Sequence, residues 1–246
     1  MHPKALLEAC TDLVRLVVKF DHPADAVVSR FFRENRSLGP RERNTLAETA
    51  YNVLRQKLLF EYLARSGPGA RERKLAVLGF HGDRNYIKSA ITDAENAWLD
   101  ATATVPAGDL QPHHRHNLPD WLVQPLKAQV GDEFQALATS LNSPAPLDLR
   151  VNDLKQKRPA ALAQLKKDAI DGVATPFSPW GIRIQGKPAI NKLPAFVKGE
   201  LEVQDEGSQL LAMLLDAKRG EMVVDFCAGA GGKTLAIGAA MRSTGR

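Results

Sequence analysis

Several common features are scarce in this sequence of 246 residues. It has two cysteines, Cys10 and Cys227, and no Cys/His spacing typical of a zinc site, so we expect neither a disulfide framework nor a bound metal. No apolar run reaches about 18 residues, so we expect no membrane-spanning helix. Glu8 and Asp12 interrupt the stretch where a signal peptide needs an apolar core, and we therefore expect a cytoplasmic protein. We also expect the protein to be a monomer.

The overall composition is that of an ordinary globular protein. Hydrophobic residues make up 44% of the chain and charged residues 25%, and the length suits one to two domains. The net charge of +5 favours polyanionic partners, but many proteins without a nucleic-acid role have a similar balance. The sequence motifs, and not the net charge, must therefore indicate which class of partner the protein binds.

The first half of the chain is predicted to be helical. Residues 3–20 place an apolar stripe on one face, and Cys10 lies on it, which marks Cys10 as a core residue rather than a nucleophile. Further helices are expected at 24–33, from Ser37 to Leu58, at 71–80 and at 84–101. Six arginines surround the third helix, and they form either a solvated surface or an RNA-contacting one: Arg30, Arg33, Arg36, Arg41, Arg43 and Arg55.

Residues 102–118 are rich in proline, glycine and polar side chains, which is typical of a linker. Three histidines fall inside it, at positions 113, 114 and 116. No cysteine or carboxylate pair accompanies them, so we interpret the stretch as a solvated loop and not as a metal site.

A small α+β domain is predicted for the next part of the chain. Helices are expected from Pro119, anchored by Trp121 and Leu122, and at 131–141 and 158–169, with strands at 147–151, 181–185 and 201–203. The segment from Asp148 to Glu200 contains ten lysines and arginines, Lys187 among them, and five acidic residues. This excess of positive charge favours contact with phosphates. The candidate RNA-binding residues are Arg150, Asn152, Lys155, Lys157 and Arg158. Only Phe177, Trp180 and Phe196 are aromatic, so a basic surface is favoured over base stacking on strand aromatics.

The chain ends in a strand, a glycine-rich turn and a helix. Residues 222–226 are predicted to form a buried strand and 234–241 a helix, preceded by a helix over 205–215 with its leucines inward. The turn is no phosphate-binding P-loop, because that template needs glycine where Cys227 stands. The dinucleotide pattern fails at Thr234. The pattern D-x-x-x-G-x-G fits Asp225, Gly229 and Gly231, and it is similar to that of S-adenosylmethionine-dependent methyltransferases.

Longer strings resemble one family. Asp-Phe-Cys-Ala-Gly-Ala-Gly-Gly-Lys-Thr, beginning at Asp225, resembles motif I of the ribosomal RNA small-subunit methyltransferase B and NOP2/Sun family, whose members methylate carbon 5 of cytosine in RNA. Val-Gln-Asp-Glu-Gly-Ser-Gln from Val203 and Leu-Arg-Val-Asn from Leu149 resemble two further family strings. The resemblance implies a cofactor site for S-adenosylmethionine at Asp225, Cys227, Ala228, Gly229, Ala230, Gly231, Gly232 and Lys233.

The resemblance also implies an α plus α/β architecture. A helical domain like the antitermination factor NusB would occupy 1–118, with Leu38 to Arg43 similar to a family string, and a small domain like an RNA-recognition motif would occupy 119–203. Residues 204–246 would open a Rossmann-like methyltransferase domain. The implied substrate is small-subunit ribosomal RNA, before its assembly.

The family's catalytic cysteines lie in Pro-Cys and Thr-Cys motifs, and this chain contains neither. We therefore expect that the chain contains no catalytic residue and is inactive by itself. We expect it to be the N-terminal part of a longer RNA cytosine-5 methyltransferase. One strand and one helix also cannot form a complete doubly wound sheet. The alternative is a non-catalytic, NusB-like RNA-binding protein whose cofactor loop is a remnant.

Overall fold

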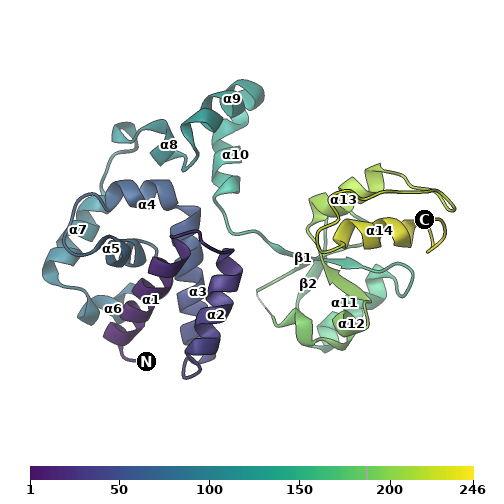
Figure 1. Ribbon diagram of the computed structural model, residues 1–246, viewed down its shortest axis with the longest axis horizontal. Coiled ribbons are helices and arrows are strands. Elements are labelled where there is room, and N and C mark those ends of the chain that lie inside the picture. Colours follow the sequence, from purple (N-terminus) through teal and green to yellow (C-terminus); the bar gives the residue numbers. More distant parts are fainter. Residues whose placement is uncertain (187) are drawn as a thin grey trace. The chain divides into compact units, whose positions relative to one another are not determined.

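A computed structural model describes residues 1–186 and 188–246, and in it the chain forms two compact units (Figure 1). Unit 1 comprises Met1–Ser143 and unit 2 comprises Pro144–Arg246. Lys187, one of the ten basic residues counted above, lies outside the described residues. Within the described ranges, no helix is long and apolar enough to cross a bilayer.

Unit 1 is helical, as its apolar periodicity predicts. Its α-helices are α1 (Pro3–Val17), α2 (Ala24–Glu34), α3 (Pro40–Arg55), α4 (Lys57–Leu63), α5 (Arg71–Leu78), α6 (Arg84–Ile87), α7 (Asp93–Ala103), α8 (Pro112–Arg115), α9 (Asp120–Val130) and α10 (Phe134–Leu141). Single 3₁₀ turns are η1 (Lys88–Ala90), η2 (Ala107–Asp109) and η3 (Gly131–Glu133).

Helix α1 lies at the centre of the main core of unit 1. Its predicted apolar stripe is buried throughout, and it packs against α3 and α5. Thr92 and Glu95 form a capping box at the start of α7, and Glu95 also pairs with Arg73 of α5 at 2.5 Å. Local helix signals and the core stripe therefore agree, which is why this part of the fold could be predicted.

The third helix ends earlier than predicted. The expected helix from Ser37 to Leu58 breaks at Gln56, and α4 begins at Lys57. The side-chain oxygen of Asn117 accepts hydrogen bonds from the amides of Leu58 (2.9 Å) and Leu59 (3.3 Å), so a residue distant in sequence caps the new helix. Nothing local in the sequence signals this cap.

Asn117 also joins the α9–α10 hairpin to the bundle. Its amide nitrogen donates to Asn142 Oδ1 at 2.7 Å, and Asn142 Nδ2 donates to the carbonyl of His116 at 2.8 Å. The hairpin has a small core of its own from Leu118, Val123, Phe134 and Ala138. The division between the units consequently falls after Ser143 and not within residues 102–118.

Two expectations for this region are wrong. Trp121 is 74% exposed and is no anchor, because helical spacing directs Val123 to the interior instead. His114 is buried and not solvated, and its ring lies 4.4 Å from that of Tyr62 in α4. The apolar body of an imidazole can fill a helix interface, which composition alone does not reveal.

Unit 2 is built on a four-stranded antiparallel sheet. Its strands are β1 (Leu147–Val151), β2 (Gly172–Ala174), β3 (Gly181–Ile184) and β4 (Leu201–Val203), in the order β2-β3-β1-β4. Its helices are α11 (Arg158–Lys167), η4 (Ile190–Lys192), α12 (Pro194–Val197), α13 (Glu206–Leu214) and α14 (Gly232–Ala240). Leu149, Ile182 and Leu201 anchor the core between sheet and helices.

The chain order through this sheet, β-α-β-β-α-β, is the ferredoxin-like one. Strands β1, β3 and β4 and helix α11 were predicted, but β2 and α12 were not. Both are short, and β2 is stabilised by pairing Gly172 with Ile184 and Ala174 with Ile182 rather than by an apolar pattern of its own.

Three of the four leucines predicted to point inward from the helix at α13 are exposed instead, and Leu210 is half-buried. Leu211, Leu214 and Leu215 are exposed, whereas Glu206 and Gln209 are buried. Glu206 accepts hydrogen bonds of 2.7 Å from the amides of Phe177 and Ser178, so the polar face of the helix is the one that satisfies a buried loop. The need to pair backbone donors decides the orientation of α13 here.

Residues 222–226 do not form the predicted buried strand. Met222, Val224 and Phe226 are 74%, 82% and 96% exposed. The amide of Val223 donates to the carbonyl of Arg246 at 2.7 Å, so the segment lies beside the last residue and not beside a sheet strand. A strand needs a partner on at least one edge, and the described residues supply no further strand at this position.

Candidate functional site

The glycine-rich turn leads directly into α14. Gly229 and Gly231 both adopt positive φ, of 55° and 84°, a conformation that side chains disfavour. The amide of Gly231 donates to Ala228 O at 2.8 Å and its carbonyl accepts from Leu235 N at 2.8 Å, so the turn closes and the helix begins within a few residues. Backbone geometry therefore explains both glycines.

Open space lies in front of this turn. A β-carbon built on Gly231 would meet no atom within 4 Å, and one on Gly229 would meet only the Cys227 carbonyl, at 3.9 Å. The protein's own packing thus leaves room at both positions. A ligand could reach the backbone there, and the first amides of α14 have no acceptor within the helix.

Two carboxylates lie near the start of α14. Asp225 accepts a hydrogen bond from the Thr234 hydroxyl at 2.6 Å, which ties the end of the preceding segment to the helix. Asp205 caps α13 through Ser208, whose hydrogen bonds lower the Asp205 pKa, and the Lys233 ammonium group lowers it further. Anionic and amide groups therefore meet at one point, a combination that suits an amino-acid-like ligand.

The structure brings together only some of the residues that were predicted to bind the cofactor. The turn from Asp225 to Lys233 is continuous, and Asp225 borders a cavity of about 230 Å³ whose other walls include Thr234, Ile237 and Met241. Cys227 is exposed and does not pack into a cofactor pocket as expected. The preceding Phe226 is exposed as well.

Cys10 is a core residue, as predicted. Its thiol is buried beside the Thr49 hydroxyl, 3.9 Å away, and burial raises the pKa of the thiol to about 12. A thiolate is therefore strongly disfavoured at this position, and Cys10 is not a nucleophile.

The candidate RNA-binding residues are all held by contacts within unit 2. Arg150 is 2% exposed, donates to Gln204 Oε1 at 2.7 Å and pairs with Glu202. Three others bind backbone carbonyls: Asn152 that of Gly199, Lys155 that of Lys198, and Arg158 that of Ser178. Lys157 pairs with Asp153 at 2.6 Å on the surface. Arg150 thus has a structural role, whereas the exposed Lys155 and Lys157 remain accessible to a ligand.

Unit 1 offers a second set of cations. Arg30, Arg33, Arg36 and Arg41 are exposed on α2, the following turn and the start of α3, and within the described ranges none of the four has an ion pair. Residues 1–186 and 188–246 contain no group of three or more His, Cys, Asp and Glu side chains able to hold a metal.

Comparison with known proteins places these features in a family. Residues 118–191 match the model of the RsmF/B-like methyltransferase ferredoxin-like domain. The ribosomal RNA small subunit methyltransferase B of Pseudomonas syringae is 36% identical over 139 residues, which cover 56% of this chain and 31% of that protein. These matches confirm the resemblance of the chain to the small-subunit methyltransferase B and NOP2/Sun family. The chain spans about a third of the length of this relative.

Two further comparisons cover nearly the whole chain. The probable ribosomal RNA small subunit methyltransferase B of Synechocystis is 27% identical over 95% of this chain and 60% of its own length. The crystal structure of PH0851 covers 100% of the chain and 62% of its own, with a TM-score of 0.73 and 21% identity, and so shows the same fold.

Sequence reasoning missed the roles of Glu206 and Gln209. Both lie within Val-Gln-Asp-Glu-Gly-Ser-Gln from Val203, one of the strings that carried the resemblance. Gln209 accepts from the Ser178 hydroxyl at 2.6 Å and donates to the Gln204 carbonyl at 2.9 Å. The string thus couples α13 to the loop before β3, and its polar residues were the available signal.

Proposed function

We propose that this chain is part of an S-adenosylmethionine-dependent RNA cytosine-5 methyltransferase that acts on small-subunit ribosomal RNA. The observation that carries the proposal is the turn from Asp225 to Lys233, with open space before Gly229 and Gly231 and free amides at the start of α14. Relatives named as ribosomal RNA small subunit methyltransferases support the substrate class.

The residues of the turn have distinct tasks in this proposal. Gly229 and Gly231 let the cofactor approach the backbone, the amides from Gly232 onward face its carboxylate, and Asp225 meets its ammonium group. S-adenosylmethionine would supply the methyl group. Asp225 is oriented for this task by the Thr234 hydroxyl.

Cysteine chemistry is expected elsewhere in the whole protein. Carbon 5 of cytosine becomes nucleophilic when a thiolate adds to carbon 6. Cys10 is buried with a raised pKa, and Cys227 belongs to the glycine turn, so neither is assigned that role. We infer that the 246-residue chain alone binds ligands without transferring a methyl group.

A second function remains as a candidate, that of an RNA-binding protein without catalysis. The exposed arginines of α2 and α3 favour it, because they could bind phosphates without any cofactor. The two functions differ in one property: only the methyltransferase requires the turn at Gly229 and Gly231 to bind S-adenosylmethionine.

Nuclear magnetic resonance titration of the chain with S-adenosylmethionine tests the proposal, because weak binding to part of a site is still visible. Saturable shifts are expected at the amides of Gly229, Gly231 and Lys233. Gly231→Val should abolish them, since its side chain would fill the space before the turn.

Gly220→Val is the matched control. Gly220 has almost the same φ, 82° against 84°, and a β-carbon there also meets nothing within 4 Å. Both variants therefore carry the same backbone strain, and only one should lose the cofactor. Shifts that are absent in the wild type, or equal in both variants, would overturn the cofactor assignment.

A further inference from the structure

Unit 2 contains a cavity of about 220 Å³ that the proposed cofactor site does not include. We call it the Trp180 slot, and its walls are Arg150, Val151, Asp153, Trp180, Ala236, Ala239, Ala240 and Arg242. Sites that enclose a whole small molecule typically measure roughly 300–1,000 Å³. The slot is smaller, so it suits one ring of a larger ligand.

The slot is distinct from the glycine turn. Ala236, Ala239 and Ala240 lie in the second half of α14, whereas Gly231 precedes its first residue. At a rise of 1.5 Å per residue, Ala240 is roughly 13 Å further along the helix than Gly231. A ligand in the slot is therefore a different group from the amino-acid end of a cofactor bound at the turn.

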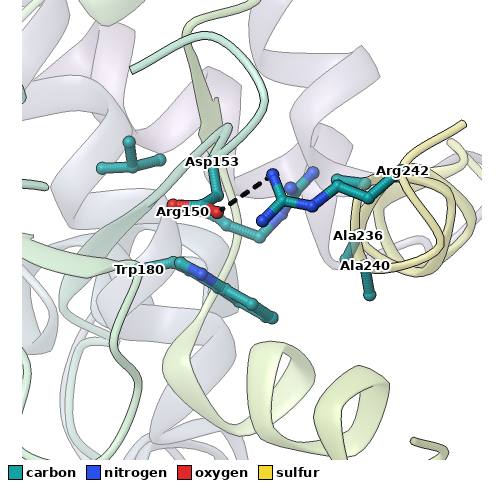
Figure 2. A pocket seen from close by; sticks show the side chains of 8 residues that line it. Arg150, Asp153, Trp180, Ala236, Ala240 and Arg242 are labelled. Atoms are coloured by element: carbon teal, nitrogen blue, oxygen red, sulfur yellow. Dashed lines mark ion pairs between the residues drawn. The ribbon is translucent and has the colours of Figure 1, made fainter. Parts of the chain in front are cut away.

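The apolar walls of the slot leave space for a planar group. The half-buried Trp180 is fixed immediately before β3, where its carbonyl accepts from Val151 N at 2.9 Å and its amide donates to Ser178 Oγ at 3.2 Å. Figure 2 shows its indole on one side of the opening and Ala236 and Ala240 of α14 on the other. Alanine side chains are short, so the surface of α14 opposite the indole ring is flat and leaves space in front of the ring.

Positive charge lies at the rim of the slot. Arg242 reaches from the end of α14 toward Asp153, at 3.7 Å (Figure 2), and Lys157 pairs with the same carboxylate at 2.6 Å. One carboxylate cannot neutralise two cations, and the Arg242 side chain is 45% exposed. The rim thus keeps a net positive charge that is accessible to an anion.

Arg242 occupies a position where glycine is normally preferred. It has φ of 57°, its amide donates to Ala239 O at 3.0 Å, and the amide of Ser243 donates to Gly238 O at 2.8 Å. These two bonds form a Schellman cap, whose left-handed residue is usually glycine. Glycine at position 242 would therefore suit this cap at least as well as arginine does.

We propose that the Trp180 slot binds one base of single-stranded RNA, stacked on the indole, while Arg242 contacts a neighbouring phosphate. The inference rests on the proposed function, because it assigns part of the RNA substrate to a named site. It revises the expectation from sequence that favoured a basic surface over the stacking of bases on aromatic side chains. A base has a flat π-face that stacks on tryptophan whatever its identity, and its phosphate supplies the anion.

The test measures binding of a fluorescent single-stranded RNA of roughly ten nucleotides, within the usual range of site sizes, to the full 246-residue chain. Trp180→Ala should weaken binding by about fivefold to a hundredfold, the range for loss of one stacked base, and Trp180→Phe should retain most of it. Trp121→Ala, which removes an exposed tryptophan of unit 1, is the matched control and should bind as the wild type does.

Arg242→Gly separates binding from folding. It places the preferred residue in the helix cap, so the melting temperature should stay the same or rise, while RNA affinity falls. The salt dependence of binding should decrease by about 0.7 in slope, which corresponds to one phosphate contact on a single strand. A purely structural arginine would not give this pair of results.

The outcomes distinguish the slot from the proposed function. If the wild type binds RNA, and neither Trp180→Ala nor Arg242→Gly changes the affinity or the salt slope, the slot is wrong and the proposed function stands. If the wild type binds no RNA, both fail. If Trp180→Ala is unfolded, Arg242→Gly decides alone: a stable variant with wild-type affinity overturns the proposal.

Discussion

Arg150 was predicted from the sequence to bind RNA, but in the structure it is buried. Replacing it tests whether its role is structural. It lies opposite Glu202 in the β1–β4 pair, donates to Gln204 and is 2% exposed. Replacing it with methionine keeps much of the buried aliphatic stem and removes the charge. Glu202 and Gln204 then lose their partner.

The expected decrease in the free energy of unfolding of Arg150→Met follows from these contacts. A hydrogen bond to a charged group contributes roughly 1.5–3 kcal/mol, and breaking a buried ion pair by removing one member costs about 3–5 kcal/mol. The Glu202 side chain is 22% exposed and can regain water, which places the loss near the lower limits, at about 2–3 kcal/mol. For a domain of this size the melting temperature of unit 2 should fall by roughly 10–20 °C.

Trp180 is the only tryptophan of unit 2, so its fluorescence in a Trp98→Phe, Trp121→Phe background reports the unfolding of that unit. Lys166→Met is the control, because Lys166 is exposed on α11 and its loss changes the charge equally. RNA affinity and its salt dependence are measured on the same proteins. The reasoning is refuted if Arg150→Met is as stable as Lys166→Met but binds RNA with a smaller salt slope.

Three further predictions concern activity, pH and RNA. The chain should transfer no methyl group from labelled S-adenosylmethionine to ribosomal RNA, and activity that Cys227→Ser removed would contradict the inference. Burial and the charge of His113 lower the pKa of His114, and burial also lowers the pKa of His116. The unfolding free energy of unit 1 should therefore fall as the pH drops below the unfolded value of about 6.5, because the unfolded chain binds more protons there. His114→Phe should reduce this dependence in urea titrations, and His116 accounts for the rest. Charge reversal at Lys155 and Lys157 should weaken binding of unrelated RNA sequences equally in gel shifts, and a sequence-dependent loss would exclude phosphate contacts.

The sequence by itself determined the features that depend on local pattern. The stripe on α1, the strand β1 and the turn at Gly229 and Gly231 were predicted and are present, because helical spacing, strand alternation and positive φ act within a few residues. The family strings also depend on order along the chain alone, and they identified the family.

Only the tertiary structure decided which side chains are free. Arg150 and Lys157 look alike in the sequence, but Glu202 and Gln204 enclose the first while the second stays exposed. The orientation of α13 depended on the unpaired amides of Phe177 and Ser178, which attract Glu206 inward and leave the leucines outside. Such choices are made by hydrogen-bond partners distant in sequence, since a buried polar group must be paired wherever its partner lies along the chain.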